Sequence, residues 1–160
     1  MTQRTAVAIR PVREDDLELV RQMFERSSPE TRYLRFFTGG AAVPEQILRR
    51  LVDVDHHCRE AVVAIVEGRV IGLAGYDRTA AHPERAEVAV VVEDAWQRQG
   101  LGARLVREAS RLARKRAVTV IEANMLSENQ GALRLVHRVS PGARPRTDGA
   151  EAAVEIPLAS

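Results

Sequence analysis

The chain has 160 residues, a length that suits one domain with a hydrophobic core of its own. Hydrophobic residues make up 45% and charged residues 29%, which argues against a disordered chain, a collagen-like repeat or a disulfide scaffold. The formal net charge of +2 gives no indication of nucleic-acid binding, and Cys58, the only cysteine, leaves no partner for an internal disulfide.

The sequence also contains no candidate membrane span. Nowhere do about 18 apolar residues follow one another, as a transmembrane helix requires. Residues 1–11 lack the apolar segment of a secretory signal peptide. A lone cysteine is typical of proteins in a reducing compartment. We therefore expect a cytoplasmic protein whose partners include neither a membrane nor nucleic acid.

The first third of the chain is predicted to form a short strand and three helices. Residues 7–12 form the strand, and the acidic residues 14–16 then suit the start of a helix. Apolar residues recur along that helix at three- and four-residue spacing, namely Leu17, Val20, Met23 and Phe24. Ser28 followed by Pro29 is typical of the start of a second helix.

Aromatic residues and then glycines mark the rest of the second helix. Its aromatic residues at helical spacing are Tyr33, Phe36 and Phe37. Gly39 and Gly40 are expected to end it, because consecutive glycines interrupt a helix. A third short helix is predicted over residues 44–54, where apolar side chains again gather on one side.

The middle of the chain changes to strand-like sequence. Residues 61–66 are a continuous apolar run, and residues 70–76 are the predicted hairpin partner. Gly68 and Arg69 are expected to form the tight turn between them. Residues 87–92 predict a further strand, rich in β-branched residues and buried on both faces.

The second half of the chain alternates helices with strands. A long helix is predicted over residues 100–116, followed by a strand over residues 118–123. Another helix is predicted over residues 129–137 and a last strand over residues 152–158. The whole order indicates an α/β fold of the mixed α+β kind, with a largely antiparallel sheet and one βαβ crossover.

The most informative stretch is residues 90–106, where an apolar strand enters a polar loop and two glycines open the long helix. Gly100 and Gly102 let a ligand approach the backbone closely, since glycine has no Cβ. The first N–H groups of a helix lack intrahelical acceptors and lie at the positive end of its dipole. Together these features predict a cradle for a diphosphate, and a tight turn without a ligand is the alternative. Neither a P-loop nor the GxGxxG fingerprint is present.

Gln97, Gly100 and Gly102, in the order Q-x-x-G-x-G, resemble the acyl-CoA-binding motif of the GNAT superfamily of N-acetyltransferases. The resemblance implies a single GNAT domain over residues 1–160, with a mostly antiparallel sheet of six to seven strands and about four flanking helices. It also implies acetyl-CoA as co-substrate, no metal, and direct attack of an amine on the thioester.

The same resemblance implies which residues bind the coenzyme, between two strands that diverge. Backbone groups expected to bond the pantetheine arm belong to Val90, Val91 and Val92. Amides expected to hold the diphosphate belong to Gln97, Arg98, Gln99, Gly100, Leu101, Gly102 and Ala103. Asn129 either binds the coenzyme or caps the helix that follows it, and both roles suit an asparagine at that position.

Residues 9–13 and 28–37 also resemble the Pat-type bacterial protein lysine acetyltransferases. This resemblance implies that the acceptor is a lysine of a protein such as an acyl-CoA synthetase. A small amine is the alternative acceptor. Two alternative functions are a non-catalytic domain that senses acyl-CoA and a nucleotide-binding domain whose loop holds another diphosphate.

Glu87 is the candidate general base. A lysine ammonium has a pKa of about 10.4, so a base that removes its proton assists transfer. In the resemblance, Ala86-Glu87-Val88 matches the position of the catalytic glutamate of protein acetyltransferases. We expect Glu87 to be partly desolvated at the edge of its apolar strand, which would make it a better base. The alternatives are a non-catalytic ion pair between Glu87 and Arg85 or another arginine, and Glu122 as the base instead.

The sequence shows no evident general acid and no metal site. The family often supplies a tyrosine from the last helix, but Val136 stands at that position, and His137 points about 100° further round the helix. Residues 53–58 include the types that bind zinc, but their spacing matches no closed zinc site. We expect a polar loop there.

Overall fold

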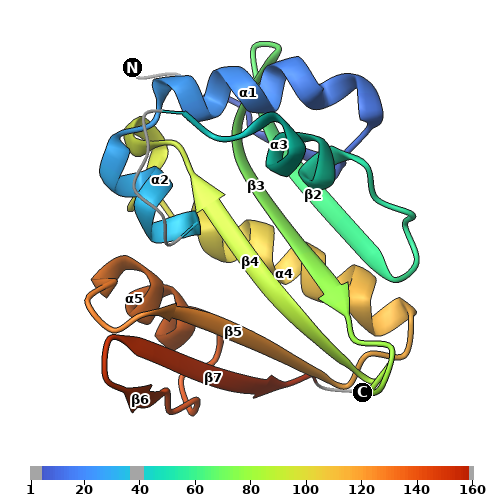
Figure 1. Ribbon diagram of the computed structural model, residues 1–160, viewed down its shortest axis with the longest axis vertical. Coiled ribbons are helices and arrows are strands. Elements are labelled where there is room, and N and C mark those ends of the chain that lie inside the picture. Colours follow the sequence, from blue (N-terminus) through green and yellow to red (C-terminus); the bar gives the residue numbers. More distant parts are fainter. Residues whose placement is uncertain (1–4, 37–41, 159–160) are drawn as a thin grey trace.

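The computed structural model describes residues 5–36 and 42–158, which form one seven-stranded sheet flanked by five α-helices (Figure 1). The strands are β1 (Ala8–Pro11), β2 (Arg59–Val66), β3 (Arg69–Arg78), β4 (Arg85–Val92), β5 (Val120–Leu126), β6 (Arg146–Asp148) and β7 (Glu151–Pro157). The helices are α1 (Leu17–Arg26), α2 (Pro29–Phe36), α3 (Glu45–Val52), α4 (Leu101–Lys115) and α5 (Gln130–Val139). The expected mixed α/β fold is confirmed. The predicted helix end at Phe37, Gly39 and Gly40 lies outside the described residues.

The strand order explains where the sheet opens. The order is β1-β2-β3-β4-β5-β7-β6, and every neighbouring pair is antiparallel except β4 and β5, which α4 connects as the predicted crossover. Only residues 85–87 of β4 pair with residues 120–122 of β5, although both strands continue beyond that point. β4 and β5 therefore diverge toward α2 and α5, as Figure 1 shows.

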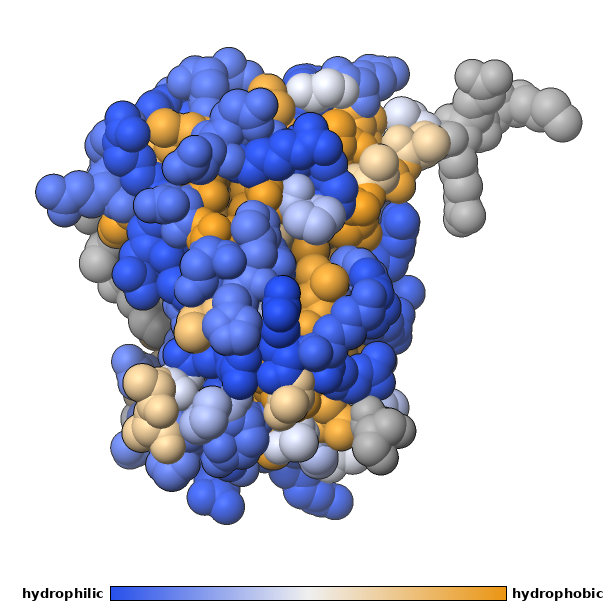
Figure 2. Space-filling model, turned by 90° about the vertical axis from the view of Figure 1, so that its right-hand side faces the viewer, coloured by the Kyte–Doolittle hydropathy of each residue, from blue (hydrophilic) through white to orange (hydrophobic). Residues whose placement is uncertain are grey.

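The two faces of the sheet pack against different helices. On β2, Ala61 and Val63 pack with α1 and α3, whereas Val62 and Ala64 pack with α4. Burying a valine fully stabilises the fold by about 1.5–3 kcal/mol, and both of these valines are inaccessible to solvent. α5 lies beside α4 and packs over β4, β5 and β7. Hydrophilic side chains cover most of the side of the molecule in Figure 2, with hydrophobic ones between them.

Three expectations about the strands are corrected. The hairpin turn is formed by Glu67 and Gly68, because a two-residue turn of this kind needs two positive φ angles, here 48° and 76°. β4 is not buried on both faces: Glu87 is exposed and Val90 half-buried, since β4 leaves β5 and the helices cover only part of it. β6 was not predicted, because its three exposed residues have no apolar alternation.

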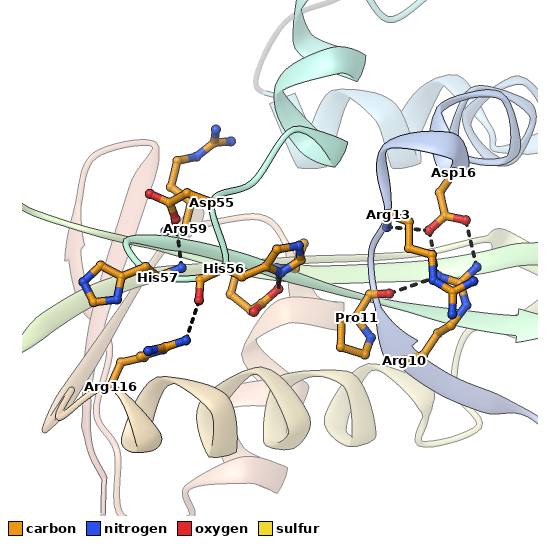
Figure 3. A network of polar contacts seen from close by, with 11 residues as sticks. Arg10, Pro11, Arg13, Asp16, Asp55, His56, His57, Arg59 and Arg116 are labelled. Carbon is orange, nitrogen blue, oxygen red and sulfur yellow. Dashed lines mark hydrogen bonds and ion pairs between the residues drawn. The ribbon is translucent and has the colours of Figure 1, made fainter.

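Charged side chains fix the start of the first helix. Asp16 is buried, and its carboxylate accepts two hydrogen bonds of 2.8 Å from the Arg10 guanidinium and one from the Arg13 backbone (Figure 3). The bond from Arg10 is the main reason that the pKa of Asp16 is lowered. Asp16 thereby caps the turn of residues 14–16 that leads into α1. This agrees with the prediction that the acidic residues 14–16 suit the start of a helix.

The cluster before β2 forms a hydrogen-bonded turn, as expected of a polar loop. Asp55 Oδ1 accepts 2.9 Å bonds from the backbone N–H groups of His57 and Arg59, and His56 Nδ1 lies 2.8 Å from Glu60 Oε1 (Figure 3). These bonds account for the local conformation by ordinary Asx-turn chemistry. Within the two described stretches of chain, no helix has both the length and the apolar character that crossing a membrane requires.

Candidate functional site

The loop that opens α4 presents a set of backbone N–H groups without acceptors. Arg98 and Gly100 adopt positive φ angles of 61° and 81°, which turn the chain into the helix. Among the described residues, no acceptor is found for the N–H groups of residues 98–103. The first turn of α4 contains no acidic residue. This diphosphate loop, residues 97–103, thus combines free donors at residues 98–103 with the positive end of a 15-residue helix. The N–H of Gln97, expected to hold the diphosphate, bonds the Asp94 carbonyl at 3.2 Å instead.

Side-chain hydrogen bonds hold the diphosphate loop in place. Gln97 Nε2 donates to the Val92 carbonyl at 2.9 Å and to Thr31 Oγ1 at 3.2 Å. The Asp94 carboxylate accepts from Ser28 N, Ser28 Oγ and Thr31 Oγ1 at 2.8, 2.8 and 3.1 Å. The Gln97 side chain therefore joins β4 to α2 and has a structural task apart from any ligand.

Arg138 is a cation at this loop that the sequence did not predict. A Cβ placed on Gly100 would lie 2.9 Å from Arg138 Nη2, so the Arg138 guanidinium packs directly against the N-terminus of α4. A cation beside the positive end of a helix is unfavourable unless an anion lies between them. No periodicity or motif points to Arg138, because its contact depends on how α5 docks beside α4.

The divergence of β4 and β5 leaves peptide groups and a pocket between them. Glu93 N donates a hydrogen bond to Ile71 O at 2.9 Å. Because every second residue of an antiparallel strand bonds the same neighbour, the peptide groups of Val91 also bond β3. Those of Val90 and Val92 point toward β5 instead. A pocket of about 100 Å³ lies here, lined by residues of α2, β4, β5 and α5. Of the three expected pantetheine contacts, Val91 is thus not free to bond a ligand through its backbone.

Residues of α5 close the far side of this pocket. Asn129 is the N-cap of α5, where its Oδ1 accepts a 3.0 Å hydrogen bond from Ala132 N, and it also lines the pocket. Val136 is buried and lines the pocket, while His137 is exposed and does not line it. The capping role of Asn129 is therefore present without any ligand.

Four carboxylates form a row across the sheet beside the pocket. Asp77, Glu87, Glu122 and Glu155 are successive register partners on β3, β4, β5 and β7, and so share one face. We call these four residues the acidic row. Arg85 bonds Glu122 at 2.6 Å and Glu155 at 2.5 Å, rather than Glu87. The alternative in which Arg85 neutralises Glu87 is therefore wrong.

Glu87 differs from its neighbours in the acidic row. Its carboxylate has no hydrogen bond or ion pair with any described residue, whereas Asp77 accepts a 2.7 Å bond from Arg59. Glu87 is exposed, so the expected partial desolvation is absent. It precedes Val88, Ala89 and Val90, which line the pocket, and an unpaired carboxylate in that position can accept a proton from a bound amine.

Comparison with known families decides the relationship. The model of the acetyltransferase (GNAT) family matches residues 18–139, which is most of the chain. The chain belongs to the GNAT family. The match includes the diphosphate loop, Glu87 and all of α5, so most of the elements around the pocket are those of a GNAT protein.

Individual GNAT proteins give the same relationship. Acetyltransferase PA5475 of Pseudomonas aeruginosa is 36% identical over 113 residues, which span 68% of this chain and 60% of that protein. The GNAT domain of S. lividans PAT is 25% identical, with a TM-score of 0.88 over 95% of this chain and 90% of that one. YncA of Salmonella typhimurium, solved with its cofactor acetyl-CoA, is 18% identical with a TM-score of 0.76 over 96% and 95%.

Proposed function

We propose that this GNAT chain transfers the acetyl group of acetyl-CoA to a primary amine. The observation that carries the proposal is the run of backbone N–H groups over residues 98–103 without acceptors at the start of α4. Acetyl-CoA contains a diphosphate, which is the anion that such a helix terminus binds best. Arg138 beside Gly100 adds a positive charge at the same place.

The other coenzyme contacts follow the divergence of β4 and β5. The inward-facing peptide groups of Val90 and the N–H of Val92 would bond the amide groups of the pantetheine arm, as a further strand would. Asn129 lines the pocket, and its Nδ2 group would remain free to donate while Oδ1 caps α5. Acetyl-CoA would supply the acetyl group as a thioester, with its reactive carbon near the closed end of the gap, where β4 and β5 still pair.

Glu87 is proposed as the general base. An acceptor amine arrives mainly as an ammonium ion, which cannot attack a carbonyl carbon until it loses a proton. Glu87 would take that proton, directly or through water, with a contribution of about 10²–10⁴-fold to the rate. The amine nitrogen then bonds the acetyl carbon as the bond to sulfur breaks, and the second proton lost from nitrogen passes to the thiolate or to water. Val136 cannot donate a proton, so the leaving thiolate would have to be released without help from that position.

The proposed acceptor is a lysine side chain of a protein such as an acyl-CoA synthetase. The likeness of residues 28–37 to the Pat-type enzymes and the structural similarity to the GNAT domain of S. lividans PAT support this choice. Glu87 supports it as well, because it is the one member of the acidic row without an arginine partner among the described residues, and a free carboxylate attracts an approaching ammonium ion. A small amine is the second candidate acceptor, and the pocket would admit either.

Two measurements test the proposal in order. Calorimetry should give binding of CoA but not of ATP; absence of heat and of thermal stabilisation with CoA would overturn the coenzyme assignment. Thiol release should then require an amine. Acetyl-lysine on an acyl-CoA synthetase after incubation with acetyl-CoA supports the protein acceptor. Turnover of small amines without acetyl-lysine on the synthetase would instead identify a small amine as the acceptor. Binding of CoA with no release for any amine would favour the sensing domain.

A further inference from the structure

Arg35, in the last turn of α2, is a cation without a hydrogen-bond or ion-pair partner among the described residues. Its guanidinium makes no hydrogen bond or ion pair with any residue in the described parts of the chain, and its Nε is buried without an acceptor. Arg32 on the same helix also has a buried Nε without an acceptor, but its Nη1 donates to the carbonyls of Phe24 and Ser27 at 3.1 and 2.7 Å. A buried N–H donor without an acceptor is costly, and Arg35 has no hydrogen bond elsewhere on its guanidinium to offset it.

The surroundings of Arg35 place this cation in the proposed reaction site. Arg35 lines the pocket between β4 and β5, with the Phe36 ring 4.8 Å from its Cζ. Asp77 and Glu87 lie near enough to attract it electrostatically, but neither is within ion-pair distance. Asp77 is already bonded to Arg59. The guanidinium is thus neither neutralised nor hydrogen-bonded by the protein.

Resting on the proposed function, we propose that Arg35 binds a carboxylate of the acceptor, so that the acceptor carries an amine and a carboxylate close together. The planar fork of a guanidinium matches the two oxygens of a carboxylate. The unpaired carboxylate of Glu87 faces the same region and suits the amine of that acceptor. The positive Arg35 and the negative Glu87 would then face the carboxylate and the amine of the acceptor, respectively, so that each charge meets its opposite.

Two sources can supply this chemistry. One is the main-chain carboxylate of a free amino acid, next to its α-amine. The other is an aspartate or glutamate beside the target lysine of a protein. Both present the same group to Arg35, and matched acceptor pairs tell them apart: L-alanine against ethylamine, and the peptide acetyl-Glu-Lys-amide against acetyl-Gln-Lys-amide.

The experiment compares kcat/KM within each pair for the wild-type protein. We expect at least one pair to show about a tenfold or greater preference for the member with the carboxylate, mainly through KM, since one charge-assisted pair has about that effect. The pair that shows it identifies the source. Equal rates within both pairs overturn the proposal, and absence of thiol release with every amine overturns the proposed function instead.

Variants then assign the preference to Arg35. Arg35→Gln should abolish the preference while slowing the neutral acceptor little, and Arg35→Lys should keep part of it, because charge remains but the fork is lost. Arg49→Gln, an exposed change on α3, is the matched control and should keep the full preference. If Arg35→Gln slows both members of a pair equally, Arg35 has only a structural role. If that variant does not fold, the preference of Arg35→Lys within the same acceptor pairs, compared with that of the wild type, tests the proposal instead.

Discussion

The diphosphate loop and the acceptor side of the pocket lie at opposite ends of β4 but are built in different ways. The loop presents backbone N–H groups of consecutive residues, aimed by two positive φ angles and a helix terminus. The acceptor side depends on side chains of α2, β3, β4 and β5 that the sheet register brings together. Substitutions should therefore affect the loop through backbone geometry and the acceptor side through charge.

This difference predicts separable effects on the two substrates. Changes on the acceptor side should alter turnover and acceptor preference with little effect on CoA affinity. Changes in the loop should alter CoA affinity while leaving the chemistry of the bound complex intact. The predictions below test that separation.

The largest expected effect is on turnover. Glu87→Gln removes the proton acceptor but keeps the shape of the side chain, so kcat should fall by about 10²–10⁴-fold while the CoA dissociation constant stays within about twofold. Thiol release across a pH series and calorimetry measure the two quantities. Glu122→Gln is the comparison variant, with a smaller loss expected because Arg85 already engages that carboxylate. An unchanged kcat at every pH would remove Glu87 from the role.

A smaller effect is expected where the backbone itself makes the site. Gly100→Ala places a Cβ at φ 81° and 2.9 Å from Arg138 Nη2, whereas a Cβ on Gly102 meets nothing nearer than Leu135 at 3.5 Å. A left-handed non-glycine residue costs about 1–2 kcal/mol, so Gly100→Ala should weaken CoA binding about tenfold. Gly102→Ala should leave affinity within about twofold. Equal losses for the two variants would show that the loop is not held by the conformation of Gly100.

Local features of the site could be predicted from the sequence for a physical reason. The diphosphate loop is contiguous in the sequence. Its apolar strand, its glycines and the start of its helix therefore form a recognisable motif at fixed spacing, with Gly100 and Gly102 as its key positions. Even there the sequence did not predict every contact. The peptide groups of Val91 are taken up by hydrogen bonds to β3, and this follows from the β3/β4 register, which the bond from Glu93 to Ile71 establishes.

Long-range contacts left no such mark. Arg35 and Arg138 are ordinary charged positions on helices, and a solvated face is the usual expectation for them. Their placement in the site depends on how α2 and α5 dock against the sheet. The partner of Arg85 was equally hidden, since Glu122 and Glu155 reach it only across β5 and β7. Side chains that converge from separate elements need the fold before they can be assigned.

Arg138 provides a more limited test of the loop. Arg138→Ala removes the cation against Gly100 and should weaken CoA binding about fivefold at low salt, with a smaller effect as salt screens the charge. Arg134→Ala, an exposed arginine of the same helix, is the control and should have no effect. Dephospho-CoA tells which phosphate is involved: an equal loss for both ligands indicates the diphosphate. Identical dissociation constants for wild type and variant would exclude Arg138 from the site.

The smallest effect concerns Asp94, which ties the loop to α2 and so connects the two regions. Burial would raise the pKa of this carboxyl, but the hydrogen bonds from Ser28 and Thr31 outweigh it and lower the pKa. The ionised form is therefore the stabilising one: its contribution is complete above the unfolded pKa of about 3.8 and disappears as the pH falls through the folded pKa. Asp94→Asn should lower the free energy of unfolding by about 1 kcal/mol at pH 7, a modest value for a carboxylate that is partly open to solvent. Urea denaturation at pH 7 and near pH 3 should show that the difference from wild type shrinks in acid, whereas Asp148→Asn, an exposed change in β6, should differ at neither pH. A difference that persists unchanged in acid would mean that Asp94 acts through its shape and not through its charge.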